Sequence, residues 1–214
     1  SADGRYVVFI STNKYLIPND TNNDDDVVMY DHQTGQLSFV SLNSDGVQSD
    51  YGYFSSLGIS ADGRYVAFAT SSTNLVPNDT NNRPDVFVRD MQLGLTTRVS
   101  VDSNGVQSDS PNYATLTPSV HISRDGRYIV FSSDASNLVP NDTNNTEDVF
   151  LHDRQTGQTT RISVDSNEVQ GIQSAIWYQG TAPNSISDDG RYVSFSSEMT
   201  NLVPNDTNGF PDVF

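Results

Sequence analysis

Cysteine is absent from the 214-residue sequence, which excludes disulfide bonds and thiolate metal sites. Basic residues are few, with 11 Lys and Arg against 27 Asp and Glu and a formal net charge of −16. This balance disfavours a nucleic-acid backbone or an anionic membrane as the partner and favours cations. No apolar run approaches the roughly 20 residues of a helical membrane span. We therefore expect no nucleic-acid partner and no membrane span.

Helical patterns are also missing, since no window of a dozen residues carries an apolar stripe of helical period. There is no initiator Met and no signal segment, so we expect a processed or trimmed piece of a longer protein. The sequence has no G-x-S-x-G motif, P-loop or zinc-ligand spacing, and His32, His121 and His152 form no constellation. We therefore predict a protein that is not an enzyme.

One block of sequence occurs four times. The copies align without gaps on the motif Asp-Gly-Arg-Tyr (DGRY), and the aspartates of successive copies are separated by 59, 63 and 64 residues. In every copy the Asp of a second motif, Asp-Thr-Asn (DTN), follows 17 residues later. The period varies only between a Val-Gln pair and the next Ile-Ser, as expected for an exposed loop. We predict a single domain over residues 1–214 with repeats at approximately 1–48, 49–107, 108–170 and 171–214.

Each block predicts short antiparallel strands. Segments such as "RYVAFAT" and "DVFVRD" are rich in β-branched and aromatic residues, and the Asp-Gly before the first is a strong hairpin signal. A full period supplies four strands, A to D, with DGR at the A–B turn and the DTN loop between B and C. Four-stranded units without helices are typical of β-propeller blades. We predict an all-β propeller with strand A innermost and a core of Val, Ile and Phe from strands B and C.

A resemblance to a known family supports this interpretation. The stretch "SADGRYVAFATSSTNLVPNDTNNRPDVFVRD", followed by "TTRVSVDSNGVQ", resembles the bacterial TolB-like, WD-type propeller repeats, especially the secreted branch with a DTN loop between strands B and C. The resemblance covers the whole chain. It implies an extracellular or periplasmic propeller that serves as a binding platform, an adaptor or a gate. We predict a calcium-binding scaffold; the alternatives are a propeller that gates or docks a catalytic domain elsewhere, and a carbohydrate-binding propeller.

The DTN loops carry the candidate metal ligands. Oxygen-bearing side chains lie at relative positions 1, 3 and 7, where alternate oxygens can converge on one ion as in calcium loops. The loops lack the Glu and Gly of an EF-hand, so a site would need waters or a neighbouring loop. The predicted calcium ligands are Asp20, Asn22 and Asp26; Asp79, Asn81 and Asp85; Asp142, Asn144 and Asp148; and Asp206, Asn208 and Asp212.

Two other interpretations of these loops stay open. Asp, Asn and Thr also form Asx turns, which satisfy loop N–H groups without an ion. The loops also contain glycosylation sequons, at Asn19, Asn78, Asn141, Asn144 and Asn205. The charge of −16 favours calcium, because bound cations relieve repulsion between acidic loops on one face.

Two further sets of residues have candidate roles. We expect the DGRY arginine and the Asp that closes strand C to pair within each blade; these residues are Arg5, Arg64, Arg127 and Arg191, and Asp31, Asp90 and Asp153. Aromatic residues fall in the variable loops, at 51–54, 113 and 177–178, on the same face as the DTN loops. They either contact a protein or glycan partner or fill space between blades. The opposite face carries tight turns, with little room for a site.

The first copy begins on strand B and the fourth ends in strand C, which predicts fourteen strands. Unpaired strand edges tend to pair with other chains. We therefore expect either a longer propeller or a homo-oligomer or filament formed by edge-strand pairing.

Overall fold

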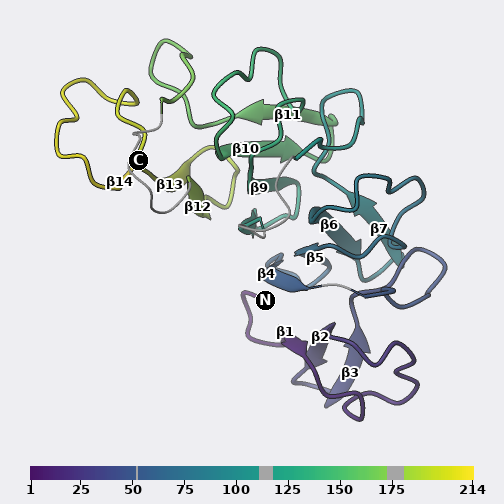
Figure 1. Cartoon of the computed structure of the whole chain (residues 1–214). Coiled ribbons are helices and arrows are strands. Elements are labelled where there is room, and N and C mark those ends of the chain that lie inside the picture. The colour runs from purple at the N-terminus through teal and green to yellow at the C-terminus, as the bar shows by residue number, and fades with distance from the viewer. Residues whose placement is uncertain (52, 111–117, 173–180) are drawn as a thin grey trace.

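The computed structural model describes residues 1–51, 53–110, 118–172 and 181–214. Within these residues the chain forms fourteen strands in four antiparallel sheets and no helix. The sheets follow one another in chain order along an arc, as Figure 1 shows. The predicted all-β propeller architecture is therefore confirmed.

The four sheets are the blades, and their strands follow the order expected from the repeat. Blade one contains β1 (Tyr6–Ser11), β2 (Asp26–Asp31) and β3 (Gln36–Phe39). Blade two contains β4 (Phe54–Ile59), β5 (Tyr65–Thr70), β6 (Asp85–Asp90) and β7 (Leu95–Arg98). Blade three contains β8 (Val120–Ile122), β9 (Tyr128–Ser133), β10 (Asp148–Asp153) and β11 (Gln158–Arg161). Blade four contains β12 (Ala182–Ile186), β13 (Val193–Ser197) and β14 (Asp212–Val213). The A strands β4, β8 and β12 lie toward the inside of the arc, where β8 contacts both of the others (Figure 1).

The two middle strands of blades two and three supply much of the core, as predicted, and residues of strand A and of the B–C loop, such as Phe54 and Leu75, add to it. Phe68 of β5 and Phe87 of β6 are register partners, are fully buried and stack with ring centroids 5.9 Å apart. Phe131 and Phe150 repeat this contact in blade three. Neighbouring blades cover these strands on both faces, which explains their continuous apolar runs instead of alternation.

The DGRY motif connects each blade to the next. A Cβ atom added to Gly126 in blade three would lie 2.2 Å from the ring of Tyr65, the motif's tyrosine in blade two. The same contact joins Tyr6 to Gly63, and a Cβ on Gly190 would meet the ring of Tyr128 at 2.1 Å. Gly126 also has a positive φ of 74°. Glycine is therefore needed for the left-handed turn and for the close approach of the tyrosine.

Replacing Gly126 with Ala should destabilise the protein more than replacing Gly157 with Ala. Both glycines have a φ of 74°, but a Cβ at Gly157 would meet nothing within 4 Å. Gly157→Ala should cost about 1–2 kcal/mol of left-handed strain. Gly126→Ala should cost roughly 1–3 kcal/mol more, because Tyr65 must move out of a packed contact. Urea unfolding of the two variants measures the difference, and equal losses would contradict the contact between blades.

Candidate functional site

The predicted ligands lie on one face, formed by the B–C loops and the connections from strand D to the next strand A. Antiparallel pairing places these two kinds of loop at the same end of each sheet. Hydrogen bonds join them: Thr21 N donates to Gln48 Oε1 (2.8 Å), and Asn22 Nδ2 donates to Ser49 O (3.0 Å). We call this surface the loop face and the opposite end the turn face.

Backbone conformation explains part of the repeated DTN sequence. Asn78 and Asn82 of the second loop have positive φ angles of 60° and 52°. The other loops repeat this pair, and Gly209 takes the second position in the fourth loop with a φ of 68°. Asn and Gly are the residues that tolerate this conformation best. Three loops have Asn and the fourth has Gly at this position, and this substitution could have indicated a left-handed turn from the sequence alone.

The asparagine at position 3 forms an Asx turn in every loop. In the second loop Arg83 N donates to Asn81 Oδ1 (3.0 Å), and Asn81 Nδ2 donates to Asp85 Oδ2 (3.3 Å). The same turn is formed by Asn22, Asn144 and Asn208, with N–H to Oδ1 distances of 3.1, 3.2 and 2.8 Å. An ion would have to compete with these partners. The turn interpretation thus has direct support, while calcium binding by these asparagines stays a prediction.

The aspartate at position 7 is deeply buried in the first three loops. It is the first residue of strand C, and Asp85 and Asp148 are 0% exposed while Asp26 is 3% exposed. A serine hydroxyl two residues beyond strand D donates to each one, from Ser41 Oγ to Asp26 Oδ1 at 2.7 Å in blade one. Burial nevertheless raises the pKa of all three carboxyl groups.

An arginine lies against this aspartate in blades two and three. Arg98 Nη1 lies 3.3 Å from Asp85 Oδ2 and 3.4 Å from Asp79 Oδ1. In blade three the corresponding Arg161 lies 3.6 Å from Asp148 and 3.3 Å from Asp142. The sequence interpretation missed this residue. The sequence feature that could have identified it is the Arg in "TTR" of two copies. The first copy has Phe39 at the same register position.

Three carboxyl groups on the loop face titrate near neutral pH. Burial, and then the nearby charge of Asp85, raise the pKa of Asp79 to about 6, although Arg98 opposes the shift. Burial and the charge of Asp148 likewise raise the pKa of Asp142 to about 6. Burial raises the pKa of Glu147 to about 7. Protonation of this face is therefore coupled to folding.

The predicted pair between the DGRY arginine and the Asp that closes strand C is present in three blades. Arg127 donates from Nε and Nη2 to the two carboxylate oxygens of Asp153, at 2.9 and 2.7 Å. The same pairs join Arg5 to Asp31 and Arg64 to Asp90. The Arg127 hydrogen bonds hold the pKa of Asp153 well below its usual range. Each pair joins the A–B turn to the C–D turn, which is a structural role.

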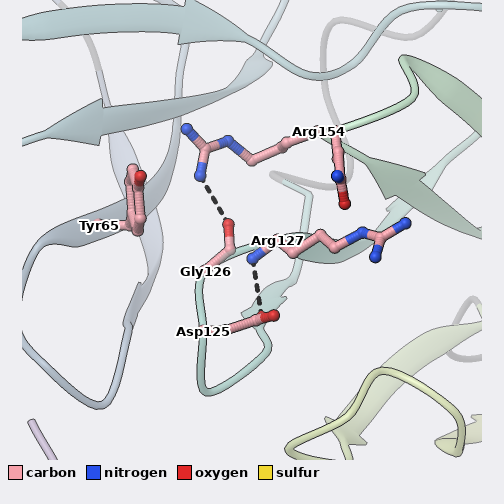
Figure 2. Close-up of a pocket in the computed structure, with 6 residues that line it drawn as sticks. Tyr65, Asp125, Gly126, Arg127 and Arg154 are labelled. Atoms are coloured by element: carbon pink, nitrogen blue, oxygen red, sulfur yellow. Dashed lines mark hydrogen bonds between the residues drawn. The ribbon is translucent and has the colours of Figure 1, made fainter.

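The expectation of little room on the turn face was wrong. A hollow of 310 Å³ lies there, lined by Tyr65, Asp125, Gly126, Arg127 and Arg154 (Figure 2). Arg154 Nη1 donates to Gly126 O at 2.6 Å, and the guanidinium lies over the Tyr65 ring, 4.2 Å from its centroid. These groups hold blades two and three together, so we assign the hollow a structural role.

The predicted loop aromatics differ in exposure. Tyr51 and Tyr53 are 52% and 66% exposed, whereas Phe54 is 3% exposed and belongs to the core. Residues 113, 177 and 178 lie outside the described residues. In the part of the chain that the structure describes, no group of three or more His, Cys, Asp or Glu side chains is placed to hold a metal ion. The described residues also contain no helix long and apolar enough to cross a membrane.

Comparison with known structures supports the class of the fold, which is a β-propeller. TolB from Acinetobacter baumannii matches with a TM-score of 0.55 and 15% identity, over 100% of this chain and 39% of that chain. A putative TolB from Agrobacterium tumefaciens matches with a TM-score of 0.51 and 17% identity, over 91% of this chain and 51% of that chain. The tricorn protease matches with a TM-score of 0.50 and 13% identity, over 98% of this chain and 16% of that chain.

The chain has a TolB-like β-propeller fold, as the repeat predicted. It spans 39% and 51% of the lengths of the two TolB structures. No family model and no curated protein matches the sequence. Identities this low show the fold alone, and the finer resemblance to a secreted branch with DTN loops stays a prediction.

The prediction that the protein is not an enzyme was wrong, because it was made from the absence of catalytic motifs. The tricorn protease, a chain named as an enzyme, shares this arrangement of strands. The repeat defines the fold, and this fold occurs both in TolB and in a protein named as an enzyme. The absence of a familiar catalytic motif in the sequence therefore does not exclude an enzyme.

Stability should rise as the pH falls from about 7 towards about 4. The pKa values of Asp79 and Asp142, about 6, and of Glu147, about 7, lie above their ordinary values of 3.8 and 4.5, so the folded protein binds protons in this window. Below pH 3.8 the protein loses the stability that Asp31 and Asp153 contribute through their lowered pKa values. Urea midpoints should therefore peak at about pH 4–5. A steady loss of stability from pH 7 to pH 4 would contradict this assignment.

Proposed function

We propose that this chain is part of an extracellular or periplasmic propeller scaffold, stabilised by calcium, that binds a protein partner on its loop face. The observation that carries the proposal is the cross-linking of that face. Thr80 N and Thr143 N donate to the side-chain oxygens of Gln107 and Gln170, each at 3.3 Å, so each of the first three DTN loops is tied to the connection that follows it. A surface held in this way loses little conformational entropy when it binds.

A second set of hydrogen bonds crosses from blade to blade. Asn74, at the start of the second DTN block, donates from Nδ2 to Gln48 O (2.9 Å) and accepts from Asp50 N (3.0 Å). Asn137 and Asn201 make the corresponding Nδ2 bonds to Gln107 O and Gln170 O, at 2.8 and 3.0 Å. The loop face is therefore one hydrogen-bonded surface across the blades.

The exposed side chains on this face favour a protein partner. Tyr51 and Tyr53 are exposed, and the Val of each Val-Gln pair is about half exposed, at Val47, Val106 and Val169. Exposed aromatic and aliphatic residues beside acidic loops combine apolar contact with charge, which is typical of protein interfaces. The location outside the cytoplasm follows the resemblance to secreted TolB-like repeats.

A propeller that gates or docks a catalytic domain is the second candidate. The tricorn protease favours it through the fold alone, since this chain covers 16% of that chain, which is named as an enzyme. The full gene sequence would separate the two candidates, because a catalytic domain would be visible there. A glycan partner and self-assembly through strand edges stay predictions. Light scattering tests for self-assembly.

Replacing Tyr51 and Tyr53 with Ser should weaken partner binding by at least about tenfold, since exposed tyrosines are frequent anchors of interfaces. Leu93→Ser is the matched control, because Leu93 is 61% exposed but lies in the C–D turn on the turn face. Partners are cross-linked to the native full-length protein, purified, and measured by calorimetry against each variant. Equal affinity for the wild type and the tyrosine variant would contradict the loop face as the binding surface. Binding to a glycan array in place of a protein would overturn the choice of partner.

A further inference from the structure

Blade one lacks the basic side chain that blades two and three place against their buried aspartates. Phe39 pairs with Val28 as Arg98 pairs with Phe87, so a phenyl ring stands where the next blade has a guanidinium. The first DTN loop is also more acidic, with Asp at positions 20, 24, 25 and 26. Among the residues that the structure describes, no ion pair includes any of these four carboxylates.

Three buried polar atoms around this loop have no hydrogen-bond partner. They are Asp20 Oδ1, Gln48 Nε2 and Ser49 Oγ, and the whole of Ser49 is only 1% exposed. In blade two the amide and the serine have partners, since Gln107 Nε2 donates to Asp79 Oδ1 (3.0 Å) and Ser108 Oγ donates to Asp85 Oδ1 (3.3 Å), although Asp79 Oδ2 has no hydrogen-bond partner there. A buried polar atom without a partner is costly, and the two oxygens, Asp20 Oδ1 and Ser49 Oγ, indicate a missing cation, whereas the Gln48 Nε2 donor does not.

The repeat shows where that occupant belongs. Ser108 Oγ bonds the buried aspartate of its own blade, whereas Ser49, at the same position of the repeat, makes no hydrogen bond to Asp26. Arg98 lies between Asp79 and Asp85, and the corresponding carboxylates in blade one are Asp20 and Asp26. In blades two and three, some atoms of the arginine–aspartate ion pairs also have no hydrogen bond, including Arg98 Nε. In those blades, however, a guanidinium group offsets part of the negative charge of the aspartates.

We propose that a calcium ion binds between Asp20 and Asp26, at the position that the guanidinium groups of Arg98 and Arg161 occupy in the next two blades. This inference rests on the proposed calcium-stabilised scaffold and assigns the ion to the loop without an arginine. The protein ligands are the carboxylates of Asp20 and Asp26 and the hydroxyl of Ser49, and waters complete the six to eight oxygens that calcium takes. Asn22 keeps its Asx turn and is not a ligand.

The charge and the ligand type both favour calcium. Asp20 and Asp26 are hard oxygen donors, and Asp24 lies close enough to interact with the Asp26 charge. A divalent ion offsets two carboxylates where a guanidinium offsets one. Sites with so few protein ligands bind calcium weakly, with dissociation constants of roughly 10⁻⁴ to 10⁻³ M.

Exchanging the residue that distinguishes the blades tests the proposal. Calorimetric calcium titration of the full-length protein should show one binding site fewer in Phe39→Arg than in the wild type, because the new guanidinium fills the position. Phe39→Leu is the matched control and should keep the site. The melting temperature of the wild type should rise by about 5 °C at saturating calcium, and that of Phe39→Arg should rise less.

Two further variants make the result decisive. Asp20→Asn removes a ligand with little change of shape, so it should also lose one site. This variant tests the same site if Phe39→Arg does not fold. Arg98→Phe copies blade one into blade two and should gain one site. An unchanged number of sites in both Phe39→Arg and Asp20→Asn would overturn the placement of the ion while leaving calcium binding elsewhere intact. Absence of calcium binding in the wild type and in Arg98→Phe would overturn both the placement and the calcium part of the proposed function.

Discussion

A carboxylate buried where strand C begins is the constraint on which the loop face depends. Asp85 has no exposed surface, and its oxygens contact Ser100, Asn81 and Arg98. Removing one partner of a buried charge typically costs about 3–5 kcal/mol, so these contacts are hard to replace. Asn81 also forms the Asx turn of the DTN loop, and Ser100 follows two residues after the outer strand β7. One buried charge thus ties together the loop, strand C and strand D of the blade.

The strand order could be predicted because the repeated block has constant length and its apolar residues have the pattern of strands. The pair between Arg127 and Asp153 could also be predicted, since both residues recur in the repeat. The packing of Tyr65 on Gly126 could not, because it joins different repeats and nothing in either segment indicates the contact. The DTN loops were only partly predicted: Asp and Asn suit calcium loops and Asx turns equally, and the arginine that distinguishes the blades lies in another strand.

The two faces of the propeller differ in their contacts. On the turn face, Arg154, Tyr65 and Gly126 hold neighbouring blades together, so their polar groups already have partners. On the loop face, the hydrogen bonds lie within and between loops and leave tyrosine and valine side chains exposed. The proposed partner would bind these exposed side chains on the loop face. This arrangement is compatible with a separate binding protein and with a propeller attached to a catalytic domain, because both use the same kind of surface.

The central claim is that each buried loop aspartate is balanced by a local cation, which is an arginine in blades two and three and a metal ion in blade one. Crystals soaked in a lanthanide salt test this claim most directly, because an anomalous difference map locates bound ions without reference to a binding model. The account predicts a peak between Asp20 and Asp26 and no peak beside Arg98 or Arg161. Peaks in the second and third loops, or an empty first loop, would contradict it.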